Sequence, residues 1–109
     1  MDVTNKTSPT QLARVGYGAE GVGYTHQGWL TEDNKYFVFG DETDETNFAL
    51  NTRTLVMDVQ DLKNIFLAGT YISPHTAAID HNQYIIGDLT YQANYFAGSR
   101  ILRMHDLAT

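Results

Sequence analysis

The sequence predicts an all-β protein made of about two four-stranded units of the kind that build β-propellers. Three observations lead to this prediction. Short segments rich in Tyr, Phe, Val, Ile, Leu and Thr are bounded by Gly, Asn, Asp or Pro, as strands commonly are. Helical periodicity is absent, and similar strings recur about 47 residues apart, a spacing typical of propeller repeats. A β-sandwich is the alternative fold, and the 109 residues are expected to form a single domain, 1–109.

Eight strands are expected, at residues 11–17, 24–31, 35–41, 52–59, 64–72, 75–80, 83–93 and 97–105. The first and the fifth have similar sequences, QLARVGY and NIFLAGT, and each comes after a Met-Asp-Val triplet. The second and the sixth carry histidines at equivalent places, His26 and His75, within a one-residue gap. These parallels indicate that one repeat contains more than a single hairpin.

The remaining four strands follow the same repeat. Asn-Lys-Tyr at residue 34 recurs as Asn-Gln-Tyr at residue 82, and Gly40-Asp41 recurs as Gly87-Asp88. The fourth and the eighth strands carry Arg, Leu and Met at alternate positions, beginning at residue 53 and at residue 100. Four strands in about 47 residues is the content of one propeller blade.

Labelled a to d outward from the propeller axis, the strands run in the order d, a-b-c-d, a-b-c. The chain therefore starts and stops within a blade. Because propellers need about four to eight blades, two blades cannot close a ring within one chain. We expect a homo-oligomer closed by intermolecular blade completion, in which residues 11–17 of one chain finish the blade begun by residues 75–105 of its neighbour.

Composition excludes several classes of function. The net charge is −6, the pI is about 4.9 and the seven basic residues are scattered, which argues against nucleic-acid binding. No apolar run approaches the roughly 20 residues of a membrane span, and residues 1–20 lack the apolar core of a signal peptide. Without cysteine there is neither a disulfide nor a thiolate metal site.

Four strings of the sequence point to a known family. They are YTHQGWLTED from Tyr24, FGDETDE from Phe39, IDHN from Ile79 and YQANY from Tyr91. With them the chain resembles the LVIVD-repeat proteins, in particular the bacterial choice-of-anchor B family. The resemblance implies a propeller and a secreted or surface-anchored location, but no transferable activity. This chain departs from that family in being short and in lacking a signal or anchor, so its compartment stays open.

Histidine and aspartate supply the first candidate site, for a divalent metal: His26, His75, Asp80 and His81. Imidazole nitrogens and carboxylates bind zinc and other first-row metals, and such a metal can activate water. The alternative is a structural role, with these side chains hydrogen-bonded to neighbouring backbone. Asp80 and His81 also form an acid–imidazole pair, but neighbours in a strand point to opposite faces, so we expect them not to meet. No residue is assigned as catalytic.

An acidic stretch supplies the second candidate site, for calcium: Asp41, Glu42, Asp44 and Glu45. Calcium prefers oxygen-rich loops. The spacing does not match an EF-hand, and the alternative is a solvated charged loop. Aromatic residues offer a third possibility, a platform on which sugar rings stack, formed by Trp29 and the tyrosines at positions 17, 24, 36, 71, 84, 91 and 95. Packing between blades is the alternative for these rings. Arg53 and Arg100 are expected to anchor their strands to the rims of the blades, where the tyrosine hydroxyls would lie, or to carboxylates.

These observations leave three functions open. The leading hypothesis is a non-enzymatic binding or assembly module that works as a homo-oligomer and holds a protein or carbohydrate ligand. The second is a metal-dependent enzyme with a His/Asp site at the propeller channel. The third is a fragment of a larger secreted or surface-anchored protein without activity of its own. Because propellers host many unrelated functions, the fold alone does not choose among them.

Overall fold

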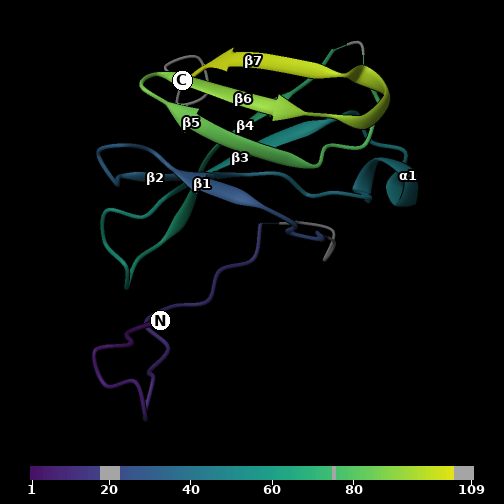
Figure 1. Ribbon diagram of the computed structural model, residues 1–109. Helices are drawn as coiled ribbons and strands as arrows, with labels where there is room; N and C mark the ends of the chain where they lie inside the picture. The colour runs from purple at the N-terminus through teal and green to yellow at the C-terminus, as the bar shows by residue number, and fades with distance from the viewer. Residues whose placement is uncertain (18–22, 75, 105–109) are drawn as a thin grey trace.

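The computed structural model describes residues 1–17, 23–74 and 76–104, and the protein is all-β, as predicted. Seven strands form two antiparallel sheets (Figure 1). The elements are β1 (Gly28–Leu30), β2 (Tyr36–Phe39), α1 (Asp44–Phe48), β3 (Arg53–Asp58), β4 (Phe66–Ile72), β5 (Asn82–Ile86), β6 (Leu89–Ala93), the 3₁₀ helix η1 (Tyr95–Ala97) and β7 (Ser99–Arg103). Neither helix among the described residues is long and apolar enough to cross a bilayer.

The first sheet is a four-stranded meander in which each strand pairs with the next, in the order β1-β2-β3-β4. Its central strands are apolar on both faces, since Val38 lies opposite Val56 and Phe39 lies opposite Leu55. All four side chains are buried. A sheet with this pattern needs a covering layer on each side.

The second sheet is a three-stranded meander, β5-β6-β7. The turn between β5 and β6 has Gly87 at a φ of 58°, a left-handed conformation that hairpin turns of this length require and glycine adopts without strain. Side chains alternate strictly in β5, where Gln83 and Ile85 are buried and Tyr84 is half-exposed. The sheet therefore has one inner and one outer face.

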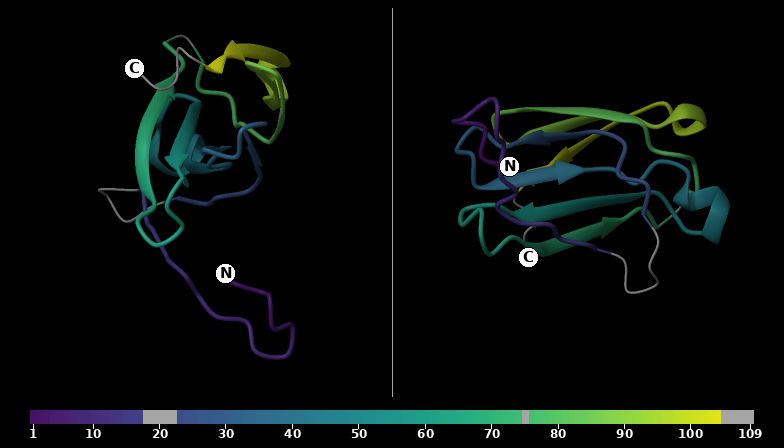
Figure 2. Two further views of the ribbon diagram at one scale, coloured as in Figure 1. Left: turned by 90° about the vertical axis from the view of Figure 1, so that its left-hand side faces the viewer. Right: turned by 90° about the horizontal axis from the view of Figure 1, so that it is seen from below.

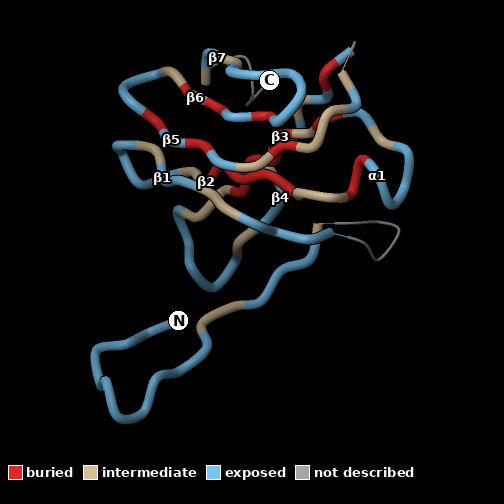
Figure 3. Tube along the Cα trace, turned by 45° about the vertical axis from the view of Figure 1, so that its right-hand side comes forward, coloured by how far each residue is buried: buried red, intermediate tan, exposed pale blue. Residues whose placement is uncertain are grey.

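The two sheets stack face to face, as the end-on view shows (Figure 2). Val38, Val56 and Ile85 are the buried residues between them, and the buried segments concentrate at this contact (Figure 3). On its other face the first sheet is covered more thinly, where the Tyr17 ring packs edge-on against Phe39 at 5.0 Å between centroids. Residues 1–10 are exposed and extend away from both sheets.

Three predicted features differ from the structure. Residues 11–17 form no strand, because the segment lies across a face of the first sheet, where its backbone meets no strand edge. Residues 76–80 form none either, because the Thr76 carbonyl accepts a hydrogen bond from the Thr52 amide at 2.9 Å and the Ala78 carbonyl accepts one from the Thr52 hydroxyl. Residues 83–93 contain a hairpin rather than one strand, so β6 separates β5 from β7. The described residues form seven strands where eight were expected.

Candidate functional site

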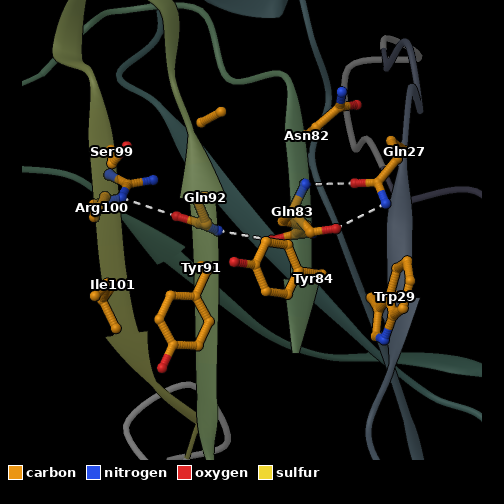
Figure 4. A pocket seen from close by; sticks show the side chains of 11 residues that line it. Gln27, Trp29, Asn82, Gln83, Tyr84, Tyr91, Gln92, Ser99, Arg100 and Ile101 are labelled. Carbon is orange, nitrogen blue, oxygen red and sulfur yellow. Dashed lines mark hydrogen bonds between the residues drawn. The ribbon is translucent and has the colours of Figure 1, made fainter. Parts of the chain in front are cut away.

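An open groove crosses the outer face of the second sheet and reaches β1. It encloses about 530 Å³ and is lined by Gln27, Trp29, Asn82, Gln83, Tyr84, Tyr91, Gln92, Ala93, Ser99, Arg100 and Ile101 (Figure 4). We call it the aromatic groove. Its volume falls in the range of about 300–1,000 Å³ that is common for small-molecule sites.

Three aromatic rings from three strands form a row along this groove. The Tyr84 and Tyr91 rings stack at 5.3 Å with an interplanar angle of 11°, and Trp29 meets Tyr84 edge-on at 6.5 Å. Trp29 and Tyr84 are each 48% exposed. Tyr84 and Tyr91 are directly paired across β5 and β6, so the strand register itself sets the stacking. The row offers flat ring surface to solvent.

A line of hydrogen-bonded amide side chains supports the groove from within (Figure 4), because Gln83 and Gln92 alternate with the tyrosines and are buried. Gln27 binds the backbone of Gln83 twice, since its Nε2 donates to the Gln83 carbonyl at 2.8 Å and its Oε1 accepts from the Gln83 amide at 2.6 Å. Gln92 Nε2 donates to Gln83 Oε1 at 2.8 Å and to Thr54 Oγ1 at 2.8 Å. These bonds join β1 to β5 and the second sheet to the first, so they fix the position of the groove.

The two candidate anchoring arginines bind different partners. Arg100 donates from Nε to Gln92 Oε1 at 2.9 Å and stacks over the Tyr71 ring at 5.4 Å. Its burial lowers the pKa of the Arg100 guanidinium. Arg53 instead binds carboxylates, as predicted: its Nε donates to Asp41 Oδ2 at 2.7 Å, and its Nη2 lies 3.3 Å from Asp44 Oδ2.

A second group, which we call the histidine–glutamate group, brings together His26, Glu42 and His81. The His26 Nδ1 lies 3.1 Å from Glu42 Oε2, and the His81 Nδ1 lies 2.8 Å from Glu42 Oε1. The two imidazole rings stack at 4.7 Å, and the Tyr95 hydroxyl donates to Glu42 Oε1 at 2.9 Å. Partial burial of Glu42 works to raise its pKa, but the hydrogen bonds from Tyr95 and His81 and the charges of both histidines lower it overall.

The described ligands of the predicted metal site therefore belong to two separate groups of side chains. His26 and His81 do meet, whereas His75 lies outside the described residues. Asp80 is buried and faces away from its neighbour His81, in keeping with the expectation that this pair does not meet. Glu42 and Tyr95 complete the group. Sequence reasoning placed Glu42 in the calcium loop and missed the role of Tyr95.

The acidic stretch is also divided. Glu42 points to the histidines, whereas Asp41, Asp44 and Glu45 are buried, so the interpretation as a solvated loop is wrong for these three. Asp44 faces Arg53. Asp41 and Glu45 converge with Asp80 in a third cluster, the buried carboxylate group.

Comparison with known proteins adds no assignment: no protein-family model, no curated protein sequence and no solved structure matches this chain.

Proposed function

We propose that this chain is a non-enzymatic binding module, built on a scaffold like the LVIVD repeats that it resembles, and that its aromatic groove takes a neutral oligosaccharide. The observation that carries the proposal is the row of Trp29, Tyr84 and Tyr91 in a groove that the exposed side chains of Asn82 and Ser99 also line. Sugars present C–H groups on ring faces and hydroxyls at ring edges. Aromatic faces match the first, and the Asn82 amide and the Ser99 hydroxyl match the second.

Charge and position favour a neutral ligand over a second copy of the chain. Each copy carries a net charge of −6, so self-association is opposed by repulsion, whereas a neutral glycan meets no such cost. The outer face also carries exposed polar side chains, Asn82 and Ser99, and the exposed ion pair of Arg103 with Asp88. An apolar face built for stacking against another blade would not display these groups.

Fluorescence tests the proposal directly, because Trp29 is the only tryptophan of the chain and lies in the groove. A panel of neutral oligosaccharides of different linkage is titrated into the protein while tryptophan emission is recorded. We expect a saturable change with at least one member of the panel. Tyr84→Ala should weaken that binding about tenfold, about 1.4 kcal/mol, because it removes the central ring of the row.

Phe96→Ala is the matched control, since Phe96 is a fully exposed aromatic outside the groove. Light scattering of the same sample shows whether copies associate, and a truncation lacking residues 1–17 tests blade completion. No saturable emission change up to millimolar sugar, together with an oligomer that dissociates on truncation, would replace the proposal by propeller assembly through this face.

A metal-dependent enzyme is the second candidate function, favoured by the convergence of His26, Glu42 and His81. Two imidazoles and one carboxylate form the ligand set of many open zinc and iron sites, where a bound water can be activated. The three side chains are 28%, 12% and 34% exposed, so a substrate has access.

Metal analysis after purification and dialysis separates this candidate from a structural role. Stoichiometric zinc, manganese or iron that is lost in a His26→Ala/His81→Ala variant of unchanged circular dichroism supports the metal site. Absence of metal in the wild type, with unfolding of the variant, supports a purely structural hydrogen-bonded group.

A further inference from the structure

The buried carboxylate group lies where the two sheets meet, at one end of the molecule. Asp41 follows β2, Glu45 lies in α1, and Asp80 precedes β5, so residues nearly 40 positions apart in the chain converge. One carboxylate oxygen of each lies within 4.8 Å of one from each of the others. The three side chains therefore surround a common point.

Burying three carboxylates together costs free energy unless a positively charged group accompanies them. Asp41, Glu45 and Asp80 are 0%, 4% and 6% exposed. Four of their oxygens, Asp41 Oδ1, both oxygens of Glu45 and Asp80 Oδ1, have no hydrogen-bond partner among the described residues. Native proteins satisfy nearly all buried polar atoms, and a buried charge is paired or bound to a metal. The unpaired oxygens point to a missing positive charge.

Among the residues that the structure describes, two guanidinium groups supply only part of that charge. Arg100 is near enough for the charges of Asp80 and Glu45 to act on its pKa, but its Nε binds Gln92 and it donates no hydrogen bond to either carboxylate. Arg53 is the guanidinium that binds the cluster, and it contacts Asp41 through Oδ2 and Asp44. Within the described part of the chain, the Arg53 guanidinium leaves Asp41 Oδ1, both Glu45 oxygens and Asp80 Oδ1 without a hydrogen bond. Burial, reinforced by the charges of Glu45 and Asp41, also raises the pKa of Asp80, in keeping with an excess of negative charge.

We propose that Asp41, Glu45 and Asp80 bind a calcium ion between the two sheets. The ligand atoms are all carboxylate oxygens, which hard cations prefer and soft transition metals do not. Calcium binds oxygen at about 2.3–2.6 Å, so two oxygens on one ion are separated by at most about 5 Å. The three oxygens lie within 4.8 Å of one another, which agrees with this pairwise limit. This site shares no residue with the aromatic groove or with the histidine–glutamate group.

The position of the ion implies its role. It would connect the end of β2 and α1, which belong to the first sheet, with the segment that leads into β5 of the second. Gly40 is required for this contact, because a Cβ there would lie 1.5 Å from Asp80 Oδ2. The ion would hold the sheets together where the packing is polar, rather than take part in chemistry.

Thermal unfolding of the full chain tests the proposal. The protein is stripped with EDTA, dialysed, and titrated with CaCl₂ at constant ionic strength, and Ca²⁺ binding is measured in parallel by calorimetry. We expect the Tm to rise by on the order of 10 °C at 100 times the dissociation constant. Asp80→Asn and Glu45→Gln should each weaken binding at least tenfold and remove most of the Tm response. Asp88→Asn, an exposed carboxylate elsewhere, should keep it.

Two outcomes overturn the proposal. One is a wild-type Tm that does not respond to Ca²⁺ up to 10 mM. The other is a response that survives unchanged in both Asp80→Asn and Glu45→Gln. The wild-type titration decides the question even if one variant fails to fold.

Discussion

The substitution Asp80→Asn, made in calcium-free buffer, is expected to stabilise the protein at pH 8 and to remove much of its pH dependence. Asp80 is buried with the carboxylates of Asp41 and Glu45, and its pKa is raised from 3.8 to about 8 by burial and by the charges of Glu45, Asp41 and Glu42. An acid with a raised pKa keeps its proton in the folded state while the unfolded chain has lost it. The free energy of unfolding therefore falls as the pH rises from about 4 to about 8.

The size of the effect follows from the two pKa values. They differ by roughly four pH units, and each unit corresponds to about 1.4 kcal/mol, which gives an upper limit of about 5 to 6 kcal/mol at pH 8. Water penetration and local relaxation reduce this limit, so we expect about 2 to 4 kcal/mol. Asparagine keeps the shape of the side chain, stays neutral, and can donate a hydrogen bond to Glu45.

Urea unfolding at pH 5 and pH 8, with EDTA present, measures the effect. The wild type should lose stability between the two values, and Asp80→Asn should lose much less, whereas the exposed control Asp88→Asn should behave like the wild type. The residual slope of the variant reports Glu45 and Asp41, whose pKa values are also raised by burial. If Asp80→Asn is no more stable than the wild type at pH 8, the carboxylate is not buried and charged as described, and the reasoning fails.

Three further substitutions test the packing. Gly40→Ala should displace the Asp80 carboxylate, because the new Cβ would lie 1.5 Å from its Oδ2, and calorimetry should then detect at least tenfold weaker Ca²⁺ binding. Leu55→Ala should lower the free energy of unfolding, measured with urea, by about 2 to 5 kcal/mol, because Leu55 is 1% exposed. The control Leu62→Ala, in an exposed loop, should change it by less than about 0.5 kcal/mol. Gln27→Ala should lower the free energy of unfolding by about 1 to 3 kcal/mol, because it leaves the backbone amide of Gln83 in β5 without its partner. Hydrogen exchange at the Gln83 amide should become faster. Unchanged exchange would contradict the bridging role of Gln27.

The fold class was predictable because the strands of the first sheet carry their signal locally. Val38, Phe39, Leu55 and Val56 form continuous apolar runs bounded by turn residues, and each became a buried part of β2 or β3. Composition also suggested a strand at residues 11–17, but a strand needs a free edge with which to pair. Whether an edge is available depends on the assembled sheets, and no local pattern contains that information.

The repeat was less informative than the strands. Sequence similarity aligned Asp41 with Asp88, yet Asp41 is fully buried and Asp88 is exposed. The difference arises after the shared Gly-Asp pair. Gly87 starts a tight hairpin into β6, whereas the chain after Gly40 turns into α1.

The candidate sites were predictable by residue type but not by grouping. The segment that carries Glu42 and, within α1, Glu45 is shaped by Thr43 and Ala49, which flank α1 with φ values of 80° and 55°. Left-handed conformations at residues other than glycine have little sequence signal. This geometry turns Glu42 towards His26 and Glu45 into the interior, a division that residue spacing could not predict.

The tyrosines show the same limit. Sequence reasoning treated them as one set, but Tyr36 and Tyr71 pack against the core and Tyr17 packs on Phe39. Tyr84 and Tyr91 remain on the outer face, and Trp29 joins them from more than 50 residues away. A groove formed by distant segments requires knowledge of which strands are neighbours.

Residues that are adjacent in the chain contribute to two different groups, so ligand binding at one group is expected to be coupled to ligand binding at the other. Asp41 and Glu42, like Asp80 and His81, are adjacent in the chain but face the buried carboxylate group and the histidine–glutamate group respectively. Two short stretches of backbone thus set the distances within both groups. Anything that orders these stretches for one group orders them for the other, and such linkage is reciprocal. A zinc titration carried out with and without calcium measures this coupling as a ratio of affinities.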